Sequence, residues 1–353
     1  ALTHLITAPI GFADSIVWMP EKTGLILSAV SVPSFHSQIF HVSYPEGKIR
    51  RITNDLSSYH GIAISADGKM LSSVKSDMES FLDIWQNNVA QTTQRLDSVK
   101  TPAFLAWLSN DTLLFTNAGL DLGMANLTTG ESKIISPDRR HSYWMPSSCG
   151  KGFAVFSGAE RRGDPLSVWK MDLGTGTMAR ITYGTNDLLA ECTGDGKWII
   201  YHDYSRRVNG NASLMKVAVN GGASQEIAHT AFSDISLDGK LLIYTNVSVT
   251  PPLLHLVSLD SWKELKTVSL GEVHLTRAMV RFMPDARGAM YQLNENGVAN
   301  LWMQPFDGGR RKQFTHFTED NIADFHWSPD GKKLGIVRRH DDQDAVLFTE
   351  INK

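Results

Sequence analysis

The sequence predicts an all-β fold, an eight-bladed β-propeller with four antiparallel strands in each blade. Two observations lead to this prediction. First, a turn phrase ending in Asp-Gly-Lys recurs along the chain, with clear copies at Asp67, Asp195, Asp238 and Asp330. Second, degenerate copies lie between them, so that eight phrases follow one another in steps of about 44 residues. Repeats of this length without helical periodicity are typical of propeller blades.

Each repeat is expected to contain four short strands. Asp-Gly between apolar runs predicts a hairpin between the first and second strands, because both residues tolerate the positive φ of a type I′ turn. The third strand shows aromatic or β-branched alternation, as around Trp85, Trp169 and Trp302. A second turn, such as Asn220-Gly221-Gly222, leads to the fourth strand.

The repeats fill the chain as one predicted domain. The blades are expected at about 9–53, 54–96, 97–136, 137–182, 183–228, 229–269, 270–315 and 316–353. The last repeat has room for only three strands, and Thr3–Thr7 resembles the phrases that end fourth strands elsewhere. We therefore expect segment 1–8 to supply the outer strand of the last blade, which would remove exposed edges between the chain ends.

Composition excludes several classes of function. The 34 Lys and Arg residues nearly balance 37 Asp and Glu residues, for a net charge of −3. This balance argues against a nucleic-acid partner. The hydrophobic content of 42% is typical of a folded globular protein. No apolar run approaches the ~18 residues that a membrane span requires, so we expect no membrane insertion by this chain.

The two cysteines, Cys149 and Cys192, lie one repeat apart. A bridge between neighbouring blades is conceivable, but two free thiols are the favoured interpretation, because one is expected in a turn and the other inside a strand. Two cysteines do not suffice for a cysteine-built zinc site.

The phrase Trp327-Ser328-Pro329-Asp330-Gly331-Lys332 resembles the blade phrase of TolB-like, PD40-repeat propellers, a WD40-like class. Phrases such as Arg51–Leu56 and Asn300–Gly309 are similar to one subgroup, the C-terminal propeller domain of acidobacterial receptor-type serine/threonine protein kinases. The resemblance covers almost the whole chain. It implies a bacterial sensor or protein-binding domain on the extracytoplasmic (periplasmic) face of the membrane.

Catalytic motifs are missing from the sequence. There is no Gly-x-Ser-x-Gly of hydrolases and no Gly-x-Gly-x-x-Gly, His-Arg-Asp or Asp-Phe-Gly of kinases. The twelve histidines lack the spacing of metal ligands. We therefore expect no enzyme activity, catalytic residue, metal or cofactor. The alternative is a metal-dependent polysaccharide lyase or hydrolase with its site in the central channel, because oligogalacturonate lyases share this repeat class.

One position on the first strands separates the repeats into two halves. Four residues before the acidic turn position, the first four repeats carry apolar residues, and the last four carry Glu191, Asp234, Arg281 and His326. First strands line the channel of a propeller, so these four side chains are predicted to form a polar patch near it. Mutual salt bridging is the favoured interpretation, because buried charges need partners. Contact with a ligand is the alternative.

Connections between second and third strands supply further candidates. The longest are expected at 160–164, 204–211 and 338–342, and they carry Arg161, Arg206, Arg207 and Arg338. Arginines can pair with carboxylates or phosphates, although solvated surface loops are the favoured interpretation. We expect any ligand on this loop face over the later blades. The mixed charges indicate a protein, a peptide or a zwitterionic small molecule.

Overall fold

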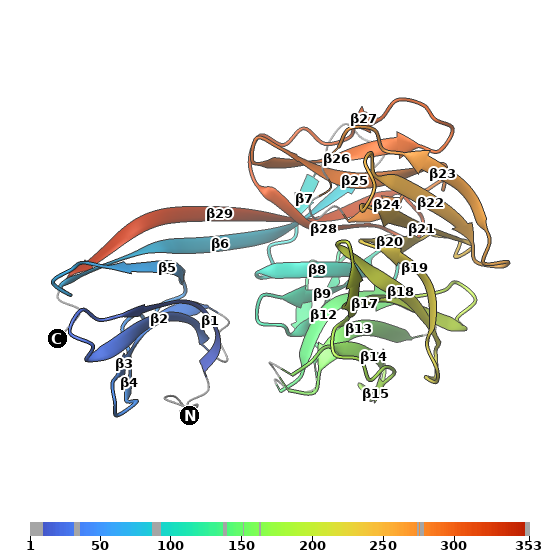
Figure 1. Ribbon diagram of the computed structural model, residues 1–353. Coiled ribbons are helices and arrows are strands. Elements are labelled where there is room, and N and C mark those ends of the chain that lie inside the picture. Colours follow the sequence, from blue (N-terminus) through green and yellow to red (C-terminus); the bar gives the residue numbers. More distant parts are fainter. Residues whose placement is uncertain are drawn as a thin grey trace. The chain divides into compact units, whose positions relative to one another are not determined.

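The computed structural model describes residues 10–31, 36–86, 93–136, 140–150, 152–161, 164–273, 275 and 279–349 (Figure 1). Every regular element in these ranges is a β-strand, so the all-β prediction is confirmed. No helix that could cross a membrane occurs among them. The chain divides into two compact units, one formed by Ala1–Glu79 with His340–Lys353 and the other by Ser80–Arg339. Each unit is described separately.

The larger unit contains five complete sheets of four antiparallel strands, and each sheet corresponds to one repeat. They are β8 (Pro102–Trp107), β9 (Thr112–Asn117), β10 (Leu122–Asn126) and β11 (Ser132–Ile134); β12 (Ser142–Ser148), β13 (Phe153–Ala159), β14 (Ser167–Asp172) and β15 (Met178–Arg180); β16 (Asp187–Cys192), β17 (Trp198–Val208), β18 (Asn211–Ala218) and β19 (Gln225–Thr230); β20 (Ser233–Ile235), β21 (Leu241–Asn246), β22 (Leu253–Ser258) and β23 (Glu264–Ser269); and β24 (Val280–Phe282), β25 (Gly288–Glu295), β26 (Val298–Pro305) and β27 (Lys312–Gln313).

A sixth group of four strands closes the ring of the larger unit. It combines β28 (Asn321–Trp327) and β7 (Thr93–Arg95) with parts of the long strands β6 (Met70–Gln86) and β29 (Lys333–Thr349). β28 pairs with the first part of β29, and β7 pairs with the last part of β6. Contacts of β28 with β8, of β8 with β12, of β12 with β16 and of β20 with β24 bring the first strands together at the centre. This arrangement is a β-propeller.

The smaller unit contains one complete sheet and part of another. The complete sheet consists of β1 (Ile10–Trp18), β2 (Gly24–Ser31), β3 (Ser37–Ser43) and β4 (Ile49–Arg51). The other part consists of β5 (Ser58–Ile64) with residues 70–79 of β6 and 340–349 of β29. A core of Ile26, Ile39 and Leu71 joins the two. The outer strand expected at Thr3–Thr7 lies outside the described residues.

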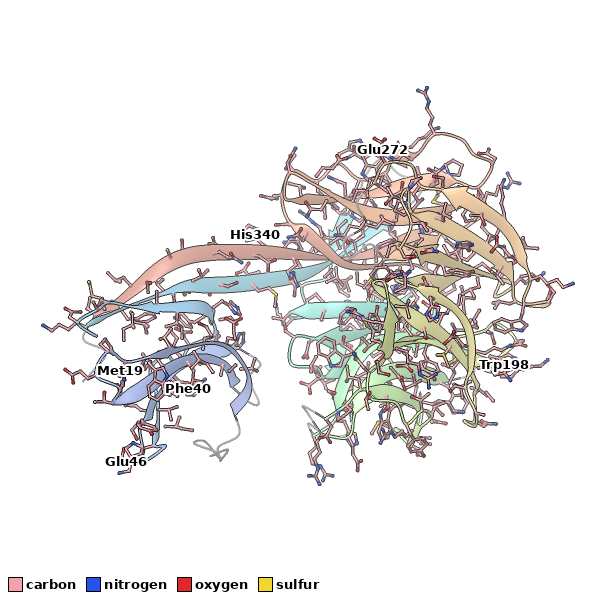
Figure 2. The ribbon with its side chains drawn as sticks, viewed as in Figure 1. Met19, Phe40, Glu46, Trp198, Glu272 and His340 are labelled. Carbon is pink, nitrogen blue, oxygen red and sulfur yellow. A yellow bond between two sulfur atoms is a disulfide. The ribbon has the colours of Figure 1, made fainter. Side chains whose placement is uncertain are left out.

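The second and eighth repeats differ from the expectation, because they share one sheet instead of forming two. The loop predicted at 338–342 is wrong, since these residues continue β29, and His340 lies along that strand (Figure 2). Turn chemistry explains the difference. The fifth and seventh repeats reverse direction at Asn209-Gly210 and Asn296-Gly297, all with positive φ. β6 contains no glycine, proline or asparagine, and neither does β29 after Gly335, so neither strand offers the Asn-Gly pair at which the other two repeats turn.

The recurrent Asp-Gly phrase forms the predicted hairpin between first and second strands. In the last copy the Asp330 carboxylate accepts hydrogen bonds from the Ser328 hydroxyl (2.7 Å) and the Lys332 amide (3.1 Å). Gly331 has a φ of 67°, whereas Asp330 is not among the residues with positive φ. The predicted type I′ turn is therefore wrong in detail. Only the glycine adopts the left-handed conformation, and the aspartate stabilises the turn through its side chain.

Candidate functional site

Four consecutive first strands bring the predicted polar residues together at the centre of the larger unit. Arg281 of β24 lies in the middle, with only 7% of its side chain exposed. Its Nη1 is 3.6 Å from Glu191 Oε1 on β16 and 3.5 Å from Asp234 Oδ1 on β20. Its Nη2 is 3.6 Å from Asp324 Oδ1 on β28. We call Glu191, Asp234, Arg281, Asp324 and His326 the channel cluster.

Direct hydrogen bonds connect this cluster to neighbouring blades. Arg281 donates from Nε to the Phe325 carbonyl (3.2 Å) and from Nη2 to His326 Nε2 (2.7 Å). Because a guanidinium only donates, His326 Nε2 is the acceptor of this hydrogen bond. Asp234 accepts from the Phe282 amide at 2.6 Å. These contacts agree with the favoured interpretation of mutual pairing between blades.

The pKa values of the three carboxyl groups of the cluster are shifted in different directions. Burial, followed by the charge of Asp234, raises the pKa of Glu191 from 4.5 to about 8. Burial also raises the pKa of Asp234, although Arg281 opposes the shift. At Asp324 burial again opposes ionisation, but His326 and Arg281 hold the pKa of this carboxyl below its usual range. Near neutral pH the cluster therefore contains an ionised Asp324 beside a protonated Glu191.

Two cavities adjoin the channel cluster, and Glu191, Arg281 and His326 line both. The smaller cavity has a volume of about 20 Å³. It is lined by residues that come just before Glu191 and Arg281 in the chain, such as Ala190 and Met279. The larger, of about 420 Å³, is lined by residues that follow them, including turn residues of the first hairpins. The first strands run in one direction around the ring, so the cluster separates two compartments of the channel.

Asp324 is the cluster member that the sequence analysis missed. Its side chain is only 3% exposed, and its Oδ2 accepts a hydrogen bond from the Leu105 amide at 2.9 Å. The sequence contained a signal for it. Asp324 stands two residues before His326 on the same strand, and alternate residues of a strand face the same side.

Arg206 and Arg207 lie on β17, so the loop predicted at 204–211 is wrong except for the turn at Asn209-Gly210. All four arginines of the predicted loops lie apart from the channel cluster. Arg161, Arg206 and Arg207 are exposed. Arg206 Nε lies 3.1 Å from Asp203 Oδ2, and the Arg207 guanidinium lies 4.6 Å from the centre of the Tyr204 ring. Arg338 contacts Asp320 at 2.6 Å and packs against the Phe317 ring. None of the four lines either cavity.

The interpretation of the two cysteines as free thiols is wrong. Cys149 and Cys192 form a disulfide with a Cα–Cα distance of 5.1 Å. Cys149 directly follows β12 and Cys192 ends β16, so both lie where neighbouring first strands reach the same end of the channel. The prediction considered only that one cysteine lies in a turn and the other in a strand. It did not consider that the equivalent ends of first strands in adjacent blades lie close together. Both residues line the larger cavity.

Within the described ranges, no group of three or more His, Cys, Asp or Glu side chains has a geometry that could hold a metal ion. The channel cluster instead places two carboxyl groups, those of Glu191 and Asp234, and the guanidinium of Arg281 around the larger cavity. Such an arrangement can orient a polar ligand and exchange a proton with it.

Comparisons with known proteins place the fold. The putative TolB from Agrobacterium tumefaciens superposes with a TM-score of 0.57 at 15% identity, covering 74% of this chain and 99% of that one. TolB from Acinetobacter baumannii has a TM-score of 0.44 at 16% identity, covering 72% and 63%. An oligogalacturonate lyase in complex with manganese has a TM-score of 0.47 at 11% identity, covering 95% and 89%. The chain has the β-propeller fold of TolB-like proteins.

Sequence comparison adds a short match. The uncharacterized protein YidR of Escherichia coli is 34% identical over 68 residues, which are 19% of this chain and 16% of that protein. The chain thus matches about one sixth of the length of this curated relative. No protein-family profile matches the chain.

Proposed function

We propose that this chain is a non-catalytic binding propeller whose ligand occupies the larger channel cavity. The observation that carries the proposal is the cavity of about 420 Å³ beside the channel cluster. Its volume lies in the range of about 300 to 1,000 Å³ that is usual for small-molecule sites. Apolar walls such as Leu108, Ile235 and Phe282 adjoin the few placed polar groups, which is the composition such sites have.

The setting of the propeller is part of the proposal. The phrases that resemble acidobacterial receptor-type kinases support a role as the sensor domain of a bacterial receptor kinase-like protein, with ligand occupancy passed to another domain. The disulfide between Cys149 and Cys192 supports an extracytoplasmic location, because disulfides persist in oxidising compartments.

Binding can be tested with a panel of small probes that differ in charge: glycylglycine, gluconate, sorbitol and glucamine. We expect at least one to bind at about 10 mM or below, measured by calorimetry. Replacing Ser147, which lines both cavities, by tryptophan should abolish this binding by filling the space. Ser261→Trp, in the exposed turn before β23, is the matched control.

Two outcomes would overturn the proposed function. One is that no probe binds in a manner sensitive to Ser147→Trp. The other is metal-dependent cleavage of oligogalacturonate by the purified chain with manganese, which would establish the lyase alternative.

We also propose that the eight repeats supply eight blades and that Thr3–Thr7 forms the missing outer strand of the last. The described strands support this, because the smaller unit has only three strands in its second group, with β29 as the last. Deletion of residues 1–8 should then expose the edge of β29 and lower the melting temperature by several degrees. A truncated chain that melts with the parent would contradict this closure.

A further inference from the structure

The channel cluster contains fewer positive charges than its carboxyl groups require. Glu191, Asp234 and Asp324 share the single guanidinium of Arg281, at 3.5 to 3.6 Å. Charge-assisted hydrogen bonds are shorter, about 2.7 to 2.9 Å. The direct hydrogen bonds of Arg281 instead go to the carbonyls of Val280 and Phe325 and to His326. Arg281 therefore compensates these carboxyl groups only in part.

Glu191 has the least satisfied carboxyl group of the three. Its Oε2 is buried and has no hydrogen-bond partner, although a backbone hydrogen bond from Ile235 to this carboxyl lowers its pKa. For Asp234 and Asp324, no side-chain oxygen is left without a partner in this way. The Glu191 side chain is 16% exposed, and the residue lines the larger cavity. The exposed part of the Glu191 side chain is what a donor group in the cavity would approach.

From this geometry we propose that the larger cavity binds a small hydroxylated primary amine, whose ammonium group pairs with the carboxyl groups of Glu191 and Asp234. This inference rests on the proposed function and names its ligand class. An ammonium supplies three hydrogen-bond donors and one positive charge, and the Glu191 and Asp234 carboxyl groups that line the cavity can accept those hydrogen bonds. No lysine lines the cavity within the described part of the chain, so no protein ammonium competes for the position.

The walls of the cavity carry side chains that can hydrogen-bond the hydroxyl groups of the proposed ligand. Ser147 and Ser148 line it beside the cluster, opposite apolar residues such as Leu237. Hydroxyl side chains can both donate to and accept from ligand hydroxyls. A carboxylate in the same position would face the carboxyl groups of Glu191 and Asp234, so an anionic ligand of equal size should bind more weakly.

Binding should release a proton. Burial raises the pKa of Glu191, so this carboxyl is protonated near pH 7. When the ammonium pairs with it, Glu191 loses its proton to the buffer, and a carboxylate–ammonium pair replaces the carboxylic acid. The titratable and charged groups facing Glu191 are Asp234 from β20, Arg281 from β24, and Asp324 and His326 from β28. No proton is created or lost in this exchange.

The test compares glucamine with sorbitol and gluconate, which have the same six-carbon chain but differ in their terminal group. Calorimetry at pH 7 in two buffers with different ionisation enthalpies measures affinity and the number of protons released. We expect glucamine to bind at least about tenfold more tightly than either analogue, with release of close to one proton. Glu191→Gln should weaken glucamine binding by about tenfold or more and abolish the release. Glu226→Gln, on exposed β19, is the control and should change neither quantity.

Each outcome is decisive. Preference for sorbitol, gluconate or glycylglycine, abolished by Ser147→Trp, would overturn the amine proposal but leave the binding function intact. Absence of binding by all probes would overturn both. Glucamine binding with no proton release, or binding that Glu191→Gln leaves unchanged, would also overturn the amine proposal, because the ligand would then not contact this carboxyl.

Discussion

The inner strands of the larger unit form two arcs with opposite chemistry at one repeat position. β16, β20, β24 and β28 present Glu191, Asp234, Arg281 and His326, which form the channel cluster with Asp324. β8 and β12 present Ala106 and Met145 at that position instead, and a core that includes Ala106 packs behind them. Both arcs belong to the same ring of four-stranded sheets.

This contrast shows that the repeat does not require charge at the inner position. An apolar residue supports the first strand as well as a charged one does, so the charges of the polar arc are an addition to the fold. The polar arc buries three carboxyl groups beside one guanidinium, and removing these groups from water costs free energy.

The largest effect should come from removing the central charge of the polar arc. Arg281→Ala leaves Glu191, Asp234 and Asp324 without their shared cation, and loss of one partner of a buried ion pair costs about 3 to 5 kcal/mol. Met145 is the half-buried residue at the equivalent position of the apolar arc, and Met145→Ala should cost about 2 kcal/mol or less. Urea unfolding of both variants at pH 7 measures the difference. Equal losses would mean that the cluster is no more important for folding than the apolar arc.

The connection between the two arcs should have the next largest effect. The disulfide joins Cys149, after β12 of the apolar arc, to Cys192 of β16 in the polar arc, across 43 residues. A loop of this length predicts a stabilisation of up to about 4 kcal/mol. Cys192→Ser should therefore lower the melting temperature, and a reductant should lower that of the parent but not that of the variant. Two reactive thiols in the native, unreduced chain would contradict this link.

The smallest effect should be a pH dependence confined to the polar arc. The pKa of Glu191 is raised from 4.5 to about 8, so the folded chain holds a proton that the unfolded chain releases between these values. The stabilisation is complete below about pH 4.5 and is lost as the pH rises through about 8. Glu191→Gln should remove this decline, because the amide resembles the protonated acid and does not titrate. A parent chain whose unfolding free energy matches that of the variant at pH 5 and pH 8 would contradict the shift.

The sequence by itself determined the all-β class, the repeat and the hairpins between first and second strands. These features depend on local chemistry, since a turn such as Ser328–Lys332 is held by side-chain and amide contacts within five residues. The position of the polar arc was also predictable, because alternation along a strand fixes which residues face the channel.

Tertiary structure alone decided which strands pair and which side chains meet. β6 and β29 contain no Asn-Gly turn at their centres and continue as long strands, so the neighbours available in space determine their partners. The disulfide and the contact between Asp324 and the Leu105 amide join residues 43 and 219 positions apart. Arg338, predicted in a loop, packs against Phe317 and pairs with Asp320 for the same reason. Such contacts depend on how the ring closes, and local sequence patterns carry no information about distances across it.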